Sequence, residues 1–329
     1  MKRRRRFLPA LALIVAFASG CGGGAEDEGV TTEEMLRTGR VDLLVDEIYY
    51  LPTAEEPGSP IEYLPLRRWD FIFVGAAATD EAGLDDSAFI SAAIPGRFDH
   101  LTVYLGKDAA GFAYAAELNV DALRMAGYAM QVAGGIRLLC LGTDYGAWVH
   151  PSAEQLLDPS RPRTAKTFRP DARATLLAKE AELLAVVREH LETEFHYQLE
   201  FEILAGDKQF LLVDDGLAGG AGCADYWVAL FEEHAGLCFP GVRMGAAEVA
   251  DYFRHDPEGS TATVPPQLNP FGEGELRLSD LFEQGFEIIA DAPHEFLCDG
   301  TQEAGLVVAD RILTSGHLTE IPTHPRPVP

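Results

Sequence analysis

Residues 216–236 of the chain read GLAGGAGCADYWVALFEEHAG, a glycine-rich stretch that continues into an apolar pattern. Four glycines precede Cys223, and they let the backbone bend sharply because glycine has no Cβ atom. From Asp225 the apolar residues recur at roughly helical spacing, and Gly236 is a typical helix stop. The stretch therefore predicts a turn followed by a helix that begins at Cys223.

The position of Cys223 at the start of a predicted helix affects the reactivity of its thiol. Unpaired N–H groups and the helix dipole at an N-terminus favour an anion, so a thiol there loses its proton more readily and becomes a better nucleophile. The alternative is that Cys223 is a small buried hydrophobic residue, which is a common role of cysteine in protein interiors. The nucleophile hypothesis also requires a base.

A candidate base lies upstream in the segment FDHLTVYLG, residues 98–106. Its alternating pattern predicts a strand with Leu101 on one face and His100 on the other. A second predicted strand, FAYAAELNV at residues 112–120, carries Glu117. A hairpin of suitable register would place Glu117 beside His100. The alternatives are a structural histidine at a strand start and a solvated strand carboxylate.

The remaining cysteines and histidines fit other roles. Cys140 lies in the apolar run IRLLCLG and is interpreted as a buried strand residue, which argues against a nucleophile there paired with His150 or His190. Cys238 and Cys298 are the favoured disulfide pair if any exists, and the alternative is that both are free. His190 and His196 are six residues apart and fall on different helix faces, so no metal site is expected there. No other cofactor is expected either.

The N-terminus has the features of a bacterial export signal. Lys2–Arg6 is a basic run, Phe7–Phe17 is a short apolar core, and Ala18–Gly20 are small residues directly before Cys21. This order resembles a lipobox, which implies cleavage before Cys21 and lipid attachment to its thiol, although an ordinary signal peptide cut near Gly20 is the alternative. The lipid would tether the protein outside the cytoplasm, with the periplasmic face of the outer membrane as the expected place.

The charge of the chain excludes some partners. The formal net charge is −26, and loss of the five basic residues of the leader would make it −26 − 5 = −31. Nucleic acids and anionic lipid head groups both require a basic protein surface. We therefore expect no nucleic-acid partner, and a membrane contact only through lipid on Cys21.

The sequence predicts one domain between two terminal segments. The expected parts are a signal peptide at 1–20, a flexible tether at 21–40, a single domain at 41–315 and an extended tail at 316–329. Within the domain the patterns predict loops at 52–65, 156–170 and 257–274, strands at 69–75, 135–142, 197–204, 209–213 and 286–290, a short helix at 123–132, a helix at 171–195 with Asp171 as N-cap, and a helix start at 277–282.

The order of these parts resembles the permuted papain-fold hydrolases, the YiiX-like relatives of NlpC-type cell-wall peptidases. In that group the histidine strand precedes the cysteine helix, and the resemblance covers roughly residues 69–290. It implies an α+β fold with an antiparallel sheet or small barrel packed against helices. It also implies that Cys223 is the nucleophile, His100 the base and Glu117 the residue that orients the imidazole. Trp69 stands where the family usually has glycine before the aspartate.

The expected function is a membrane-tethered, extracytoplasmic cysteine amidase or peptidase. Its substrate would be a peptide or acyl amide, with cell-wall peptide as one candidate. One alternative is a catalytically inactive lipoprotein that uses the same fold for binding or scaffolding, because a fold does not by itself imply activity. The other is transfer of an acyl group to or from lipid.

Overall fold

The structure is a computed structural model, and it describes twelve parts of the chain. These are residues 32–54, 59–75, 98, 100–126, 129–192, 200–203, 210–213, 223–239, 241–245, 266–271, 286–289 and 295–297. The predicted signal peptide, Cys21 and the predicted tail lie outside the described residues, as does the predicted helix start at 277–282.

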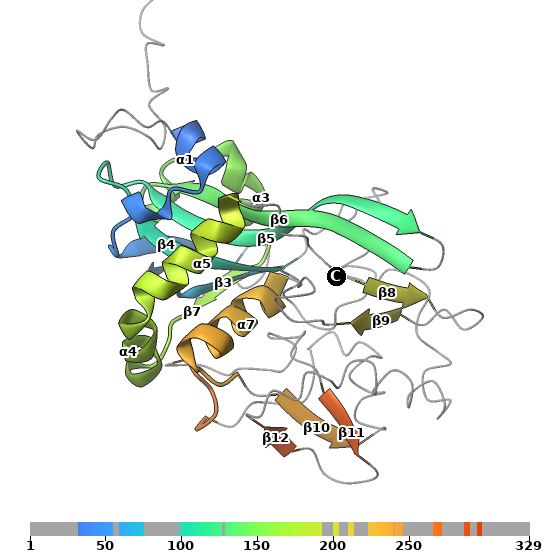
Figure 1. Cartoon of the computed structure of the whole chain (residues 1–329). Coiled ribbons are helices and arrows are strands. Elements are labelled where there is room, and N and C mark those ends of the chain that lie inside the picture. Colours follow the sequence, from blue (N-terminus) through green and yellow to red (C-terminus); the bar gives the residue numbers. More distant parts are fainter. Residues whose placement is uncertain are drawn as a thin grey trace, which may run out of the picture.

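A seven-stranded sheet forms the centre of the fold, with strand order β7-β3-β4-β5-β6-β8-β9 (Figure 1). Every neighbouring pair in it is antiparallel. The strands are β3 Phe71–Val74, β4 His100–Lys107, β5 Ala113–Ala126, β6 Ala129–Gly142, β7 Arg163–Lys166, β8 Glu200–Ile203 and β9 Phe210–Val213. The combination of helices with antiparallel sheets makes the fold α+β, as the sequence predicted.

Among the described residues, four longer helices accompany the sheet: α1 Thr32–Thr38, α4 Pro170–Ala178, α5 Glu180–Glu192 and α7 Cys223–Ala235. Helix α7 contacts β4 and β5, while α1 and α5 contact β6. The strand residues that join the helices in one apolar core alternate along the sequence, as Leu101, Val103 and Leu105 do in β4. Helix α1 lies within the predicted tether and buries Met35 in this core.

Phe71 is the hub of the aromatic part of this core. Its ring centroid lies 5.3 to 6.1 Å from five other rings, which come from four separate segments of the chain. These rings belong to Phe73, Phe168, Phe231, Phe239 and Phe271. All six residues are at most 4% exposed, so the hub joins β3 to α7 and to residues 266–271 without solvent between them.

The opposite face of the sheet is covered by shorter elements. They are β1 Tyr49–Thr53, β2 Glu62–Leu66, η2 Asp144–Gly146, η3 Pro151–Ala153 and α3 Glu154–Leu157. Most of them join the alternate strand residues, such as Ile72, Tyr104 and Leu139, in a second apolar cluster. The short helix η1 Val41–Leu43 contacts α5 instead and buries Val41 in the core on the helix side of the sheet. The sheet therefore has two buried faces over much of its area.

A separate three-stranded sheet has the order β11-β10-β12. Its strands are β10 Gly241–Gly245, β11 Phe286–Ile289 and β12 Glu295–Leu297. Gly241 pairs with Leu297, the residue directly before Cys298. Cys298 lies outside the described residues, so the bond between Cys238 and Cys298 stays a prediction.

The predicted helix at 123–132 is wrong. Residues 123–126 belong to β5 and residues 129–132 to β6, and Leu123 pairs with Val132 across the hairpin. Gly127 lies in the middle of the predicted helix, where a glycine costs about 1 kcal/mol relative to alanine. In the long β5–β6 hairpin the backbone N–H and C=O groups find their partners on the opposite strand. In a short helix the same groups would have been paired within the segment.

Two predicted loops contain strands. The range 52–65 includes parts of β1 and β2, and the range 156–170 includes β7 and part of α3. Pro52 and Pro65 lie in the two-stranded sheet β1–β2, where each strand has only one partner. Proline is tolerated in such edge strands because its missing N–H group can face away from the partner strand.

The predicted helix at 171–195 is divided in two. Helix α4 ends at Ala178 and α5 begins at Glu180, with Lys179 between them in a non-helical conformation. Asp171 is not the N-cap, because Pro170 occupies the first helical position and Arg169 precedes it. Proline is favoured at the first position of a helix, since its N–H group would be unpaired there in any case.

Candidate functional site

His100 and Glu117 meet on neighbouring strands of the sheet. The register of β4 and β5 pairs Thr102 with Glu117, which brings His100 diagonally close to the carboxylate. His100 Nε2 lies 2.7 Å from Glu117 Oε2. The His100 side chain is 22% exposed and that of Glu117 is 5% exposed, so the imidazole is partly open to solvent while the carboxylate is buried.

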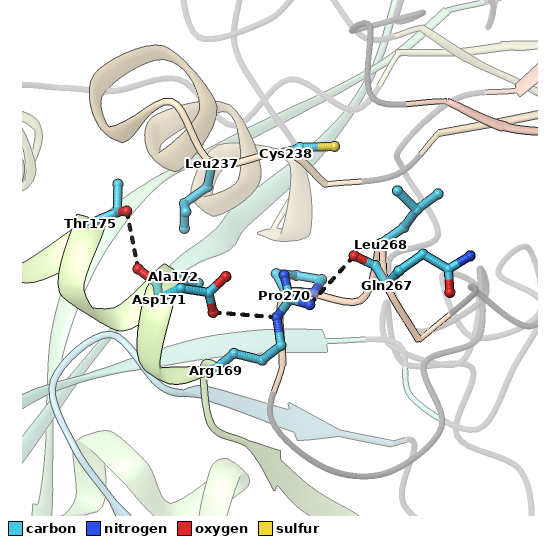
Figure 2. Close-up of a pocket in the computed structure, with 9 residues that line it drawn as sticks. All are labelled: Arg169, Asp171, Ala172, Thr175, Leu237, Cys238, Gln267, Leu268 and Pro270. Carbon is cyan, nitrogen blue, oxygen red and sulfur yellow. Dashed lines mark hydrogen bonds and ion pairs between the residues drawn. The ribbon is translucent and has the colours of Figure 1, made fainter.

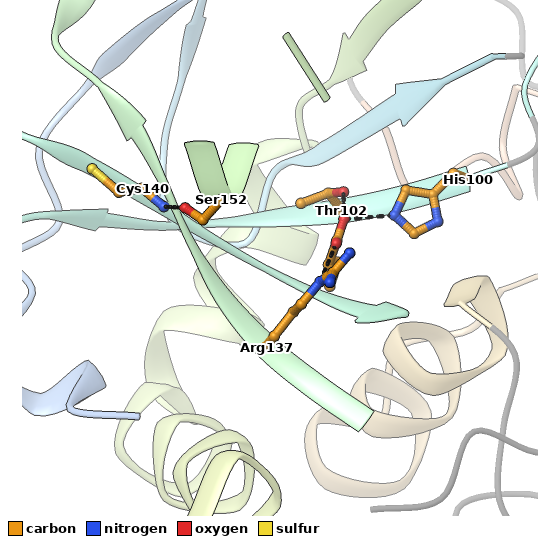
Figure 3. Close-up of polar contacts among 6 residues, drawn as sticks. His100, Thr102, Arg137, Cys140 and Ser152 are labelled. Carbon is orange, nitrogen blue, oxygen red and sulfur yellow. Dashed lines mark hydrogen bonds and ion pairs between the residues drawn. The ribbon is translucent and has the colours of Figure 1, made fainter. Parts of the chain in front are cut away.

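Two further side chains bind the same carboxylate (Figure 3). Arg137 Nε, from β6, donates a hydrogen bond of 2.7 Å to Glu117 Oε1. The Thr102 hydroxyl donates one of 3.4 Å to Glu117 Oε2. The sequence reasoning missed Arg137, although a lone arginine in the apolar run GIRLLCLG was a signal that could have pointed to it.

The charges around Glu117 determine its protonation. Burial alone would raise the pKa of Glu117, because it removes water from the ionised form. The charges and hydrogen bonds of His100 and then Arg137 outweigh burial, and the pKa of Glu117 falls below its ordinary value. Glu117 is therefore an ionised, buried carboxylate at neutral pH, which is the state that holds an imidazole in one orientation.

Helix α7 begins at Cys223, as the sequence predicted, and ends before Gly236, whose φ of 65° is typical of a helix stop. It runs antiparallel to α5. The last turns of α7 lie beside the start of α5, where His234 Nδ1 is 3.2 Å from Glu182 Oε1. Its first turn lies beside the end of α5, where His190 Nδ1 is 2.8 Å from the Tyr226 hydroxyl.

These contacts indicate where the first turn of α7, which begins at Cys223, lies relative to the sheet. The start of α5 is bound through the ion pair of Glu180 with Arg68, whose Nε donates to the carbonyl of Leu105 in β4. Because α7 is antiparallel to α5, its first turn lies away from Leu105. In Figure 1, α7 begins toward the end of the sheet at which β3 stops and β4 starts. For Cys223 the structure describes the backbone but not the side chain.

The pleat of the sheet separates the polar cluster from the main body of α7. His100, Thr102 and Glu117 lie on one face, whereas α7 packs Phe231 against Phe71 on the other. His100 is the first residue of β4, so it lies at the end of the sheet. Cys223 can therefore come close to His100 only around the end of the sheet at which β4 starts.

Cys140 and Cys238 are both disulfide-bonded. Cys140 is fully buried in β6, as the sequence predicted, and its thiol is not available as a nucleophile. Its nearby polar partner, Ser152, accepts a hydrogen bond of 3.1 Å from the Cys140 backbone N–H group and contacts His150. The arrangement supports the rejection of Cys140 with His150 as a catalytic pair.

A small pocket of about 190 Å³ lies apart from the polar cluster (Figure 2). It is lined by Arg169, Asp171, Ala172, Thr175, Leu237, Cys238, Gln267, Leu268 and Pro270. These residues come from the start of α4, the segment after α7 and residues 266–270. The pocket adjoins the segment that follows Lys166 at the end of β7. Lys166 pairs with Phe71 at one end of β3, whereas His100 pairs with Val74 at the other end, so the pocket and the polar cluster lie at opposite ends of this strand.

Neither a metal centre nor a membrane-spanning helix is found among the described residues. No group of three or more histidine, cysteine and acidic side chains in this part of the chain is arranged to hold a metal ion. Among the helices that the structure describes, none combines the length and apolar character needed to span a membrane.

Comparisons with known proteins gave no relative. No protein-family model, no curated protein and no solved structure matches the chain.

Proposed function

We propose that the chain is an extracytoplasmic cysteine amidase or peptidase with a permuted papain-like fold, tethered to a membrane through lipid on Cys21. The observation that carries the proposal is the contact of 2.7 Å between His100 and the buried Glu117, at the end of the sheet toward which the cysteine helix begins. The antiparallel sheet packed against α7 is consistent with this fold.

In the proposed reaction, His100 takes the proton of the Cys223 thiol. The thiolate, favoured by the N-terminus of α7, attacks the carbonyl carbon of an amide, and backbone N–H groups near Cys223 stabilise the oxyanion. The imidazolium gives its proton to the leaving amine as the carbon–nitrogen bond breaks. Water, deprotonated by His100, then hydrolyses the thioester and releases the acid and the free thiol.

The bond to Glu117 has a specific role in this scheme. It occupies Nε2 of His100, which leaves Nδ1 for the thiol. A carboxylate that accepts from one ring nitrogen fixes the tautomer and orientation of the ring and stabilises its protonated form.

Selective alkylation of Cys223 tests the proposal. We expect iodoacetamide, without reductant and at neutral pH, to modify Cys223 in the full-length protein at least about tenfold faster than a free thiol of ordinary pKa. His100→Gln should reduce this rate to that of an ordinary cysteine. His234→Gln, which changes a partly exposed histidine on the other end of α7, is the matched control and should leave the rate unchanged. Peptide mass spectrometry identifies the modified residue.

Two results would contradict an enzymatic role. If Cys223 reacts only after a reductant is added, it is a disulfide partner, and the protein is better explained as a binding or scaffolding lipoprotein. If Cys223 reacts at the same rate in wild type and His100→Gln, the histidine does not activate it. Release of acyl groups from lipid, rather than from peptide, by a reactive Cys223 would favour the acyltransferase alternative.

A further inference from the structure

The two oxygens of the Glu117 carboxylate bind two different side chains. Arg137 stands directly opposite Glu117 in the β5–β6 register and binds Oε1, whereas His100 binds Oε2. Each oxygen therefore has a nitrogen partner of its own, at 2.7 Å in both cases. Without a second partner, the terminal torsion of a glutamate is broad and its carboxylate rotates readily.

We propose that Arg137 is a positioning residue: it fixes the Glu117 carboxylate toward His100 and sets the pH at which the His100–Glu117 pair takes up its proton. The inference rests on the proposed function of the site, since an imidazole of defined orientation and basicity is what a cysteine nucleophile requires. Arg137 acts through Glu117, and its role differs from that of His100.

The direction of the effect follows from the charges that face His100. Among the described residues these are Glu117 from β5 and, beyond it, Arg137 from β6, while Thr102 is neutral and the β3 partner is the apolar Val74. Beyond Val74 lies Arg163 from β7, whose guanidinium donates to the carbonyls of Pro52 and Asp158. Arg137 compensates part of the negative charge of Glu117. Its removal leaves the carboxylate more attractive to a proton on the imidazole, so the pair is protonated at a higher pH.

The position of Arg137 fits this role better than a role in packing. Its side chain is 45% exposed, so the guanidinium fills no space in the core. Arg188 in α5 has a similar exposure of 43% and lies 4.0 Å from Asp42, which makes it a matched control for the loss of one partly exposed arginine.

The experiment is a titration of His100 by nuclear magnetic resonance in the full-length protein with labelled histidine Cε1 positions. The His100 signal is assigned by its absence in His100→Gln. We expect Arg137→Met to raise the midpoint of this signal by about one pH unit. Arg137→Lys keeps the charge and should titrate within about 0.3 units of wild type, as should Arg188→Met. If Arg137→Met does not fold, Arg137→Gln replaces it.

An unchanged midpoint in a folded, neutral Arg137 variant would overturn the inference, and so would an equal rise in Arg188→Met. The titration is independent of catalysis, because it follows the imidazole and not Cys223. If His100→Gln leaves the alkylation rate of Cys223 unchanged while Arg137→Met shifts the midpoint, the proposed function fails and the coupling of Arg137 to the pair stands. If alkylation depends on His100 but the midpoint does not move, only the role of Arg137 fails.

Discussion

Two buried carboxylates show how the same side-chain chemistry gives opposite results in different surroundings. Burial raises the pKa of Asp70 to about 6, despite its ion pair with Arg173 and two backbone N–H donors. Glu117 is also buried, yet its pKa is lowered, because it faces both His100 and Arg137. The ion pair with Arg173 does not offset the desolvation of Asp70, whereas the imidazole of His100 and the guanidinium of Arg137 together offset that of Glu117.

Asp70 should therefore make the free energy of unfolding depend on pH. Its pKa is higher in the folded than in the unfolded chain, so the folded state binds more protons between about pH 4 and pH 6. The stability of the wild type relative to Asp70→Asn should fall by up to about 3 kcal/mol as the pH rises through this range. Urea unfolding of both proteins at a series of pH values measures the difference.

The matched control for this measurement is Asp171→Asn, because the Asp171 side chain is 73% exposed. Its difference from the wild type should change less over the same pH range than that of Asp70→Asn, because an exposed side chain loses little hydration on folding. A stability of the wild type relative to Asp70→Asn that rises with pH would mean that Arg173 outweighs burial at Asp70.

At the scale of elements, Gly142 at the end of β6 is required by close packing. Its φ is +87°, and a Cβ atom there would lie 1.4 Å from the carbonyl oxygen of Trp148. Gly111, before β5, has a similar φ of +84°, but a Cβ atom added to it would meet nothing within 4 Å. Gly111 therefore isolates the cost of the backbone conformation.

We expect Gly142→Ala to lower the free energy of unfolding by about 4 kcal/mol or more, because the Trp148 backbone must move. Gly111→Ala should cost only about 1 to 2 kcal/mol, the strain of a left-handed alanine. Thermal and urea unfolding compare the two variants. Equal losses would show that the segment around Trp148 yields to the added methyl group.

The elements that sequence reasoning predicted correctly are those with a local signal. The alternation of Leu101, Val103 and Leu105 predicted β4, and Gly236 predicted the end of α7. Residues 123–132 were wrong because their structure depends on pairing across a hairpin, which a local pattern does not contain. Arg137 was missed for the same reason, since its meaning comes from the residue opposite it on the next strand.

At the scale of the whole molecule, the strongly acidic chain has two apolar clusters on opposite faces of one sheet. With a net charge of −26, the chain offers no electrostatic reason to approach an anionic membrane. If the protein is found at a membrane, the attachment must come from elsewhere, and the predicted lipid on Cys21 supplies it.

Cys21→Ser should therefore move the protein from the membrane fraction to the soluble extracytoplasmic fraction in a bacterial host. Mass spectrometry of the wild type should find an N-terminal diacylated or triacylated cysteine. Cys223→Ser serves as the control, because it removes a different cysteine and should leave the protein at the membrane. A wild-type protein that is already soluble would contradict the prediction of a lipid anchor.

The aromatic hub around Phe71 also constrains the order in which the chain can acquire its native form. Phe71 and Phe271 are partners in the hub, so it stays incomplete until nearly the whole polypeptide has been synthesised. Contacts between residues so distant in sequence form slowly. A truncation before Phe271 would thus leave this hub permanently without one of its rings, however much of the sheet had already formed.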